Sequence, residues 1–363
     1  MKENIMFNWL DHKLGIDLGT SNTLIYQKGK GIVLQEPSVL AIRKDTGAVE
    51  AVGKEAKAMI GRTPENLEII QPIEDGVIAN FDMTTVMLQH LLGKISNGYR
   101  WLKRSHVAIS VPSDITDVKR RAVQDAVQQA GASKTLIIEE PLAAAMGAEL
   151  PVNQPCGHLV VNIGGSTIQA AIISLGGIVI SHTIRKGGMT VDRAIMEMIK
   201  KKHNLAVGLP TAEELKKDLG LAVMTEKEEQ VEVKGRNLVN GLPRSIAFTS
   251  LDLHPLFNDF IFSITEAIRL TIEKCPPELA GDVIERGIVL CGGGALIGGL
   301  EQRLQKDLSI PVRIAEQAER CVVLGTGKIL DAEPAKKLFG HSHKIFKGKE
   351  GGESIANMGE NVG

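Results

Sequence analysis

Two short stretches of the sequence carry residue types that bind phosphate. In the first, an apolar segment ends at Asp17, and Gly19, Thr20, Ser21 and Asn22 follow before the next apolar segment. Glycine lets the backbone approach an anion, successive N–H groups form an anion-binding nest, and hydroxyl and amide side chains add donors. Asp17 offers a hard oxygen ligand for the Mg²⁺ that accompanies a nucleoside triphosphate. A plain hairpin turn without a ligand is the alternative.

The second stretch repeats this pattern about 145 residues further along the chain. An apolar segment ends at Asn162, a turn of small residues follows, and another apolar segment returns. The turn contains Gly164, Gly165, Ser166 and Thr167. Two such hairpins predict two similar domains that face one ligand. Asn162 takes the place of Asp17, so the second copy lacks the carboxylate.

Glu140 and a run of three glycines are further candidates. Pro141 favours the first turn of a helix, so Glu140 is expected at a helix N-terminus directly after an apolar strand. Carboxylates there are often only caps, but between two phosphate-binding hairpins Glu140 is placed to orient or deprotonate a water that attacks a γ-phosphate. Gly292, Gly293 and Gly294 remove the side chains where a ring or a sugar-phosphate would press against the backbone.

Two more pairs of residues indicate further contacts. Glu213 and Lys216 are expected on one face of a helix over residues 211–219, with a surface ion pair as the alternative. Trp101 and Leu102 lie in a basic loop, residues 97–104, of a kind that favours lipid headgroups, with packing back onto the domain as the alternative. The apolar residues 1–10 leave the same choice between a membrane-surface anchor and a leader that packs on the first strand.

Composition narrows the class of protein. The chain has 363 residues, 43% apolar and 23% charged, as expected for a soluble globular protein of two or three domains. A net charge of −1 lacks the basic footprint of a nucleic-acid-binding protein, so no nucleic-acid partner is expected. Four widely spaced cysteines predict reduced thiols in the cytoplasm, without a disulfide or a zinc site. The longest apolar run, residues 287–300, is too short to span a membrane.

Periodicity predicts the elements that position these residues. Helices are expected over residues 82–95, 115–130, 191–203, 211–219, 257–274, 295–308 and 320–330, and exposed strands within residues 224–244. Asp82 is the expected cap of the first helix, and Gly325 and Gly327 are expected to let the last helix pack closely. The tail from about residue 335 lacks periodicity and is expected to be disordered.

The order of the motifs resembles one superfamily. The segments are GIDLGTSNT, EEPLAAAMGA, ISLGGIV, TAEELKKDLG, PPELAGDVIERGIVLCGGGALIGGL and LGTGKIL, between Leu14 and Leu330. Together they resemble the actin and heat-shock-chaperone ATPase superfamily and, within it, the MreB/Mbl family of bacterial actin-like cytoskeletal proteins. The resemblance implies an α/β actin-like ATPase fold, in which two duplicated ribonuclease-H-like domains with two smaller inserted subdomains surround a nucleotide cleft.

The resemblance also implies an organisation and a biological setting. Residues 1–12 would form a leader; 13–30, 66–150 and 315–333 subdomain IA; 31–65 subdomain IB; 151–185 and 246–314 subdomain IIA; 186–245 subdomain IIB; and 334–363 the disordered tail. ATP, or GTP, would bind with Mg²⁺ in the cleft. The chain would form homopolymer filaments in the cytoplasm, at the inner face of the cell membrane. There, with cell-wall elongation membrane proteins and paralogues of the family, it would organise cell-wall synthesis and maintain cell shape.

Position by position, the resemblance assigns roles. The first phosphate motif spans Asp17, Gly19, Thr20, Ser21 and Asn22, with Asp17 at the metal; the second spans Gly164, Gly165, Ser166 and Thr167. Glu140 would position water together with residue 162, Glu213 and Lys216 would contact the nucleoside, and Gly292 to Gly294 the adenosine. Trp101 and Leu102 fall where the family has a membrane-inserting loop.

The second phosphate motif departs from the family pattern Asp-Ile-Gly-Gly-Gly-Thr-Thr-Glu. Asn162 loses a charge that helps to hold Mg²⁺ and water, and Ser166 adds a side chain where backbone approaches phosphate. Ile168 and Gln169 remove a hydroxyl and a carboxylate, and Met189 stands where Asp or Asn is common. A misplaced water or metal costs ~10²-fold in rate, whereas affinity rests on many contacts. Nucleotide binding with slowed or absent hydrolysis is therefore expected.

Other functions compete with this one. A non-hydrolysing regulator that co-assembles with an ordinary family member fits the same departures. A chaperone-type ATPase needs a long substrate-binding domain, which is not expected in the residues after Leu330. A sugar kinase needs an aspartate base for a hydroxyl, and no aspartate in the sequence is a convincing candidate.

Overall fold

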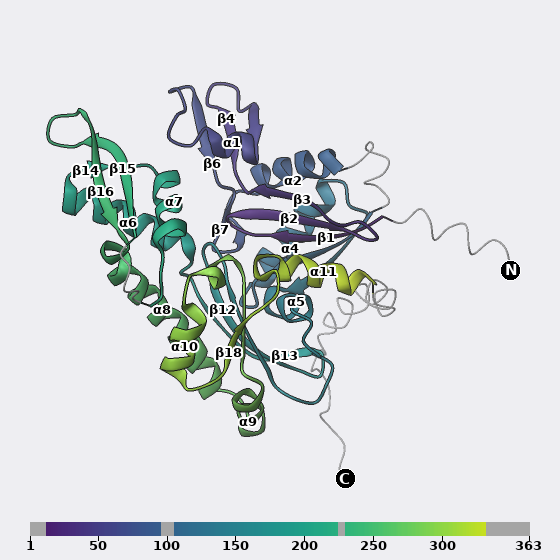
Figure 1. Ribbon diagram of the computed structural model, residues 1–363. Coiled ribbons are helices and arrows are strands. Elements are labelled where there is room, and N and C mark those ends of the chain that lie inside the picture. Colours follow the sequence, from purple (N-terminus) through teal and green to yellow (C-terminus); the bar gives the residue numbers. More distant parts are fainter. Residues whose placement is uncertain (1–11, 96–104, 224–228, 332–363) are drawn as a thin grey trace, which may run out of the picture.

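Two five-stranded sheets of the same topology form the centre of the protein (Figure 1). They are seen in a computed structural model that describes residues 12–95, 105–223 and 229–331 of the chain. Each sheet is an antiparallel meander of three strands with two parallel strands added beside the first. The two sheets correspond strand for strand, as the repeated hairpin predicts.

The first sheet has the strand order β10-β9-β1-β2-β3. Its strands are β1 (His12–Leu18), β2 (Asn22–Gln27), β3 (Gly31–Pro37), β9 (Ser105–Val111) and β10 (Lys134–Glu139). Helices α2 (Phe81–Ile95) and α4 (Asp117–Gln129) bury their apolar stripes on one face of this sheet. Thr116 caps α4 by accepting a hydrogen bond from the Lys119 N–H, so the helix begins at Asp117 and not at residue 115.

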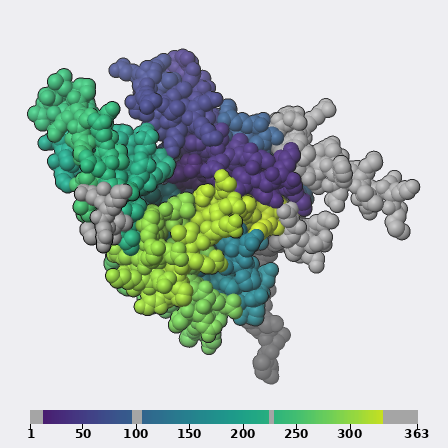
Figure 2. Space-filling model, in the orientation of Figure 1, coloured from purple at the N-terminus to yellow at the C-terminus, as the bar shows by residue number. Residues whose placement is uncertain are grey.

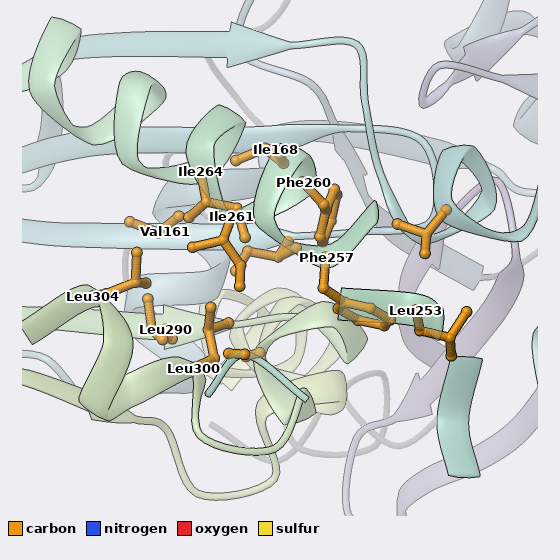
Figure 3. Close-up of a cluster of buried hydrophobic side chains, with 14 of the residues drawn as sticks. Val161, Ile168, Leu253, Phe257, Phe260, Ile261, Ile264, Leu290, Leu300 and Leu304 are labelled. Atoms are coloured by element: carbon orange, nitrogen blue, oxygen red, sulfur yellow. The ribbon is translucent and has the colours of Figure 1, made fainter. Parts of the chain in front are cut away.

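The second sheet has the order β13-β12-β11-β17-β18. Its strands are β11 (His158–Ile163), β12 (Ile168–Ser174), β13 (Gly177–Ile184), β17 (Ile288–Cys291) and β18 (Val312–Ile314). The long helix α8 (Ser250–Glu273) covers one face, together with α9 (Pro277–Arg286) and α10 (Leu300–Leu308). Figure 3 shows Phe257 and Ile264 of α8 packed over Val161 and Leu290 of the strands.

Helices α5 (Glu140–Gly147) and α11 (Cys321–Asp331) pack against each other between the two sheets (Figure 1). A Cβ added to Gly325 would lie 1.8 Å from the Ala143 carbonyl oxygen, and one on Gly147 would lie 1.8 Å from that of Cys321. The expected close packing at Gly325 is confirmed. Because α11 also packs on β1 and α5 on β11, the helix pair links the two sheets.

Each sheet carries an inserted lobe, and the two lobes stand side by side (Figure 1). The first contains β4 (Leu40–Arg43), β5 (Val49–Val52), α1 (Lys54–Ala58) and β6 (Leu67–Ile70), followed by the hairpin β7 (Ile73–Glu74) and β8 (Val77–Ile78). The second contains α6 (Gly188–His203), β14 (Leu205–Ala206), α7 (Leu209–Leu219), β15 (Gln230–Asn237) and β16 (Pro243–Thr249).

Some predicted helix ends are wrong. The Asn80 side chain, not Asp82, accepts from the Met83 N–H at the start of α2. Helix α8 begins at Ser250 because the side chains of Thr249 and Asp252 form a capping box well before residue 257. The helix expected over residues 295–308 is instead a 3₁₀ turn, Gly293–Leu296, and the separate α10. Gly299, with φ 75°, separates the two.

Candidate functional site

A cavity of about 760 Å³ lies between the two halves of the protein. Figure 2 shows the notch between the purple lobe and the green lobe on one face of the molecule. All sixteen cleft residues predicted from the sequence line this cavity: Asp17, Gly19, Thr20, Ser21, Asn22, Glu140, Asn162, Gly164, Gly165, Ser166, Thr167, Glu213, Lys216, Gly292, Gly293 and Gly294. The fold therefore brings together segments from the whole chain, and the role of each residue in binding stays a prediction.

The turns of the two hairpins have the same backbone geometry. The Gly19 N–H donates to the Asn22 carbonyl over 3.1 Å, and the Gly164 N–H donates to the Thr167 carbonyl over 2.8 Å. A Cβ on Gly19 would lie 2.8 Å from the Asn22 oxygen, so only glycine fits there without a shift. This equivalence supports the prediction that the hairpins are copies of one unit.

The two turns also touch each other. The hydroxyl oxygens of Thr20 and Ser166 lie 2.7 Å apart, and the Gly76 N–H donates to the Thr20 hydroxyl over 3.1 Å. A Cβ on Gly165 would lie 2.0 Å from Ser21 Oγ, so the turns meet where side chains are small. Ser166, expected as an obstacle to phosphate, thus bonds to the opposite turn.

The N-terminus of α6 holds the second turn in place. The Gly188 N–H donates to the Gly164 carbonyl over 3.1 Å, and the Met189 N–H donates to the Gly165 carbonyl over 2.8 Å. Met189 acts there through its backbone and does not line the cavity. Ile168 does not line it either: the side chain is fully buried in the core beneath α8 (Figure 3), so a hydroxyl at this position would lie in the core.

Two of the carboxyl groups that line the cavity, Asp17 and Glu140, are buried or nearly so beside the hairpin turns. Burial raises the pKa of Asp17 to about 6, although the Ser110 hydroxyl, which donates to its Oδ1 over 3.1 Å, lowers it. Burial and, to a smaller extent, the charge of Asp17 raise the pKa of Glu140 to about 8. Glu140 is 7% exposed, so its carboxyl keeps its proton at neutral pH.

Two amides from the second sheet bond to Glu140. Gln169 Nε2 and Asn162 Nδ2 both donate to its Oε2, the latter over 3.5 Å. The other end of Gln169 accepts from the Ser113 N–H over 3.2 Å. Both amides lower the pKa of Glu140, against the larger effect of burial. Asn162 and Gln169, which stand where the family pattern has carboxylates, therefore supply hydrogen-bond donors to Glu140.

Glu213 and Lys216 both line the cavity but do not pair with each other. Lys57 of the first lobe lies 2.7 Å from Glu213 Oε2, and Lys217 lies 2.7 Å from Oε1. Although burial opposes them, these hydrogen bonds lower the pKa of Glu213 to about 2. Lys216 pairs with Asp192 over 2.7 Å, so the surface pair considered as the alternative does not form.

The three glycines have different surroundings. A Cβ on Gly292 would lie 2.4 Å from the Ile163 carbonyl oxygen, and one on Gly294 would lie 2.2 Å from Ile163 Cγ2. A Cβ on Gly293 would meet no atom within 4 Å. Packing against the end of β11 therefore excludes side chains at Gly292 and Gly294, whereas Gly293 alone leaves open space in the cavity.

Sequence reasoning missed several residues around this cavity. They are Lys57, Ser110, Ser113, Asp192 and Phe260. Phe260 lines the cavity, whereas the other four bond to residues at or beside its wall. Nothing local marks them, because they come from different parts of the chain. Gln169 carried a signal that was read only as a lost charge: it lies two residues beyond Thr167 and therefore on the same side of its strand.

Several predictions fall outside this cavity. Trp101 and Leu102, the N-terminal leader and the C-terminal tail lie outside the described residues. Among residues 12–95, 105–223 and 229–331, none of the helices has the length and hydropathy of a membrane span. Nor does this part of the chain hold three or more His, Cys, Asp or Glu grouped to bind a metal. Mg²⁺ at Asp17 would depend on few carboxylates plus phosphate oxygens and water, a set that this ion uses.

Comparison with known proteins decides the family. Residues 11–337 match the sequence model of the family described as MreB/Mbl protein. The chain belongs to the MreB/Mbl family. The cell shape-determining protein MreB of Escherichia coli K12 is 45% identical over 322 residues, 88% of this chain and 93% of that protein. The cell shape-determining protein Mbl of Bacillus subtilis 168 is 42% identical over 318 residues, 88% of this chain and 95% of that one.

Solved structures agree on the fold of this MreB/Mbl member. MreB 5 of Spiroplasma citri bound to AMPPNP superimposes with a TM-score of 0.86 at 34% identity, covering 92% of this chain and 99% of that one. The same protein bound to ADP superimposes with a TM-score of 0.85. MamK, in a double helical filament, superimposes with a TM-score of 0.76 at 22% identity, covering 89% of this chain and 100% of that one. At this identity the match is evidence for the fold alone. The predicted actin-like fold is confirmed.

Proposed function

We propose that this MreB/Mbl protein binds ATP, or GTP, with Mg²⁺ in the cavity between the two hairpin turns. The observation that carries the proposal is the pair of turns with equivalent backbone geometry that line one cavity from opposite sides. The binding of AMPPNP and ADP by MreB 5 of Spiroplasma citri, a relative with the same fold, supports it.

Each part of the cavity suits one part of a nucleotide. The turns offer backbone N–H groups and the hydroxyls of Thr20 and Ser166 to phosphate oxygens. Asp17 offers a carboxylate to Mg²⁺. The positive charge of this ion would offset the negative charge of the phosphates. Glu213 lies at the lobe end of the cavity, where it can accept from ribose hydroxyls, and the open space beside Gly293 can take the base.

We further propose that hydrolysis is slow. A general base must be ionised, whereas burial raises the pKa of Glu140 to about 8. Asn162 brings an amide, not a second carboxylate, to the same place, and its Nδ2 points to Glu140. Water activation therefore depends on a carboxyl that is largely protonated at pH 7, while the many backbone contacts that give affinity remain.

On this proposal the protein forms filaments that help to maintain cell shape by organising cell-wall synthesis at the inner face of the cell membrane. Membership of a family whose E. coli and B. subtilis members are named cell shape-determining proteins supports it. The basic loop with Trp101 and Leu102 would insert into the membrane surface. Cell-wall elongation membrane proteins and paralogues of the family are the expected partners.

Phosphate release and sedimentation test this proposal in one experiment. Wild type, Asn162→Asp and the control Asn153→Asp, an exposed residue, are incubated with Mg²⁺ and ATP and then pelleted. Wild type is expected to pellet and to release phosphate slowly. Asn162→Asp is expected to release it faster by about tenfold or more, because a carboxylate can help to place metal and water.

Three outcomes would revise the proposal. Release by wild type as fast as by E. coli MreB would contradict slow hydrolysis. Equal rates in wild type and Asn162→Asp would remove Asn162 as the cause and leave Ser166. Pelleting only in a mixture with a second MreB would favour the regulatory paralogue.

A further inference from the structure

Gln169 is a polar side chain fully buried between the two halves of the protein. It lies near the start of β12 in the second sheet, with no exposed surface. Its Oε1 accepts from the Ser113 N–H over 3.2 Å, and its Nε2 donates to Glu140 Oε2. Ser113 and Glu140 both follow strands of the first sheet. Both ends of one amide therefore bond across the interface between the halves.

The orientation of this amide follows from its partners. A backbone N–H can only donate, so the carbonyl oxygen of Gln169 must face Ser113. The NH₂ group then faces Glu140, where a carboxyl oxygen accepts. An apolar side chain could satisfy neither neighbour, and an ionised carboxylate could not donate to Glu140. A buried donor or acceptor left without a partner is unfavourable, so Gln169 is matched to this place.

Gln169 holds one oxygen of Glu140 and leaves the other toward the cavity. Asn162 Nδ2 approaches the same oxygen, Oε2, over 3.5 Å. No hydrogen bond to Oε1 is found within residues 12–95, 105–223 and 229–331, and Glu140 lines the cavity. A Cβ on Gly76 would lie 3.7 Å from Oε1, so glycine keeps space beside this oxygen. The carboxyl is thus fixed on one side and accessible on the other.

Two further contacts near Gln169 also join the two halves of the protein. The Thr20 and Ser166 hydroxyls meet at 2.7 Å, and Arg185 pairs with Asp114 over 3.0 Å, again across the halves. If the halves moved apart by the length of a hydrogen bond, Glu140 would lose the support of Gln169. Its side chain would then be free to take other rotamers.

We propose that Gln169 is a positioning residue that holds Glu140 from the opposite wall, so that the free carboxyl oxygen is aimed into the cavity only while the two halves are together. The inference rests on the proposed function, in which Glu140 orients the attacking water. It adds the condition that closure of the cleft assembles this part of the site.

The test uses the full-length protein with two variants and a control. Gln169→Met keeps the length of the side chain without its amide, and Gln169→Ala removes it with less risk of overpacking. Gln128→Met, on the exposed face of α4, is the matched control. Spin labels at Asp45→Cys and Asn240→Cys, on the two lobes, report their separation. Cys275 is replaced by serine, because the other three cysteines are buried.

Three measurements are made on each protein: the binding of AMPPNP, the label-to-label distance distribution, and single-turnover phosphate release over a range of ATP concentrations. We expect AMPPNP affinity to change by less than about threefold, because Gln169 does not line the cavity. The distance distribution of both Gln169 variants is expected to broaden to longer values. The release rate at saturating ATP is expected to fall about tenfold, with little change in the ATP concentration at half-saturation.

Each result bears on one proposal. A distance distribution like that of wild type in both Gln169 variants, or an unchanged release rate at saturation, would overturn the role of Gln169. If wild type releases no measurable phosphate, the distance distribution alone decides. If wild type does not bind AMPPNP, the proposed function fails, while the distances measured without nucleotide still test the bridge.

Discussion

Replacing Glu140 with glutamine tests the electrostatics of the cavity directly. Burial, helped by the charge of Asp17, raises the pKa of Glu140 from 4.5 to about 8. The unfolded chain therefore loses this proton near pH 4.5, whereas the folded protein keeps it up to about pH 8. Folding takes up a proton between these values. The contribution of Glu140 to the free energy of unfolding must fall as the pH rises through this window.

The size of the effect follows from the shift. One pKa unit corresponds to about 1.4 kcal/mol. Relative to low pH, Glu140 therefore lowers the free energy of unfolding by at most about 2 kcal/mol at pH 6 and about 5 kcal/mol at pH 8. Glutamine keeps the shape and the acceptor for Gln169 but carries no charge. Glu140→Gln is therefore expected to be more stable than wild type, by a margin that grows by about 2–3 kcal/mol from pH 6 to pH 8.

Urea unfolding of wild type and variant at pH 6, 7 and 8 measures this margin. Glu139→Gln is the control, because this neighbour is about one-third exposed and pairs with Arg120 over 3.5 Å. The difference in free energy of unfolding between Glu139→Gln and wild type is expected to stay constant from pH 6 to pH 8. If the free energies of unfolding of wild type and Glu140→Gln changed in parallel with pH, the reasoning would be refuted. Such a result would mean that Glu140 has the same pKa in the folded and unfolded states.

Two further substitutions probe the interface between lobes and the layer between sheets. Lys57→Ala removes the 2.7 Å ion pair with Glu213, which joins the lobes. Because the pair is partly exposed, stability should fall by less than about 1 kcal/mol, while a fluorescent ATP analogue should dissociate about threefold faster in stopped flow. Gly325→Ala places a Cβ 1.8 Å from a backbone oxygen of α5 and should lower stability by about 1–3 kcal/mol. Gly93→Ala adds a Cβ that would meet no atom within 4 Å among the described residues, and it should be neutral or stabilising by up to about 1 kcal/mol in the same thermal unfolding assay.

The parts of the site that were predicted from the sequence depend on local signals. The Gly19 turn and its copy at Gly164 are each a glycine between two apolar strands, and the repeat itself indicated the shared cavity. Glu140 was located because Pro141 marks a helix start at a strand end. The paired topology of the sheets follows from the same duplication, so the architecture around the cavity was predictable.

The contacts across the cavity were not predictable, because they depend on how the two halves meet. Glu213 was expected beside Lys216 on one helix face, yet Lys57 from the other lobe takes the place of that partner. Gln169 was read as a missing charge, although its amide bonds to two groups of the opposite half. The spacing of residues within one strand or helix carries no information on such pairs.

The central claim, that the cavity between the hairpin turns is the nucleotide site, is tested most directly by titrating AMPPNP with Mg²⁺ into wild type and Gly293→Phe. Gly293 lines the cavity, and a Cβ there would meet no protein atom within 4 Å, so a phenylalanine side chain is expected to occupy the site without disturbing the fold. We predict one AMPPNP bound per wild-type chain and a loss of affinity of about thirtyfold or more in Gly293→Phe, with unchanged thermal unfolding. Equal affinity in the two proteins would contradict the account.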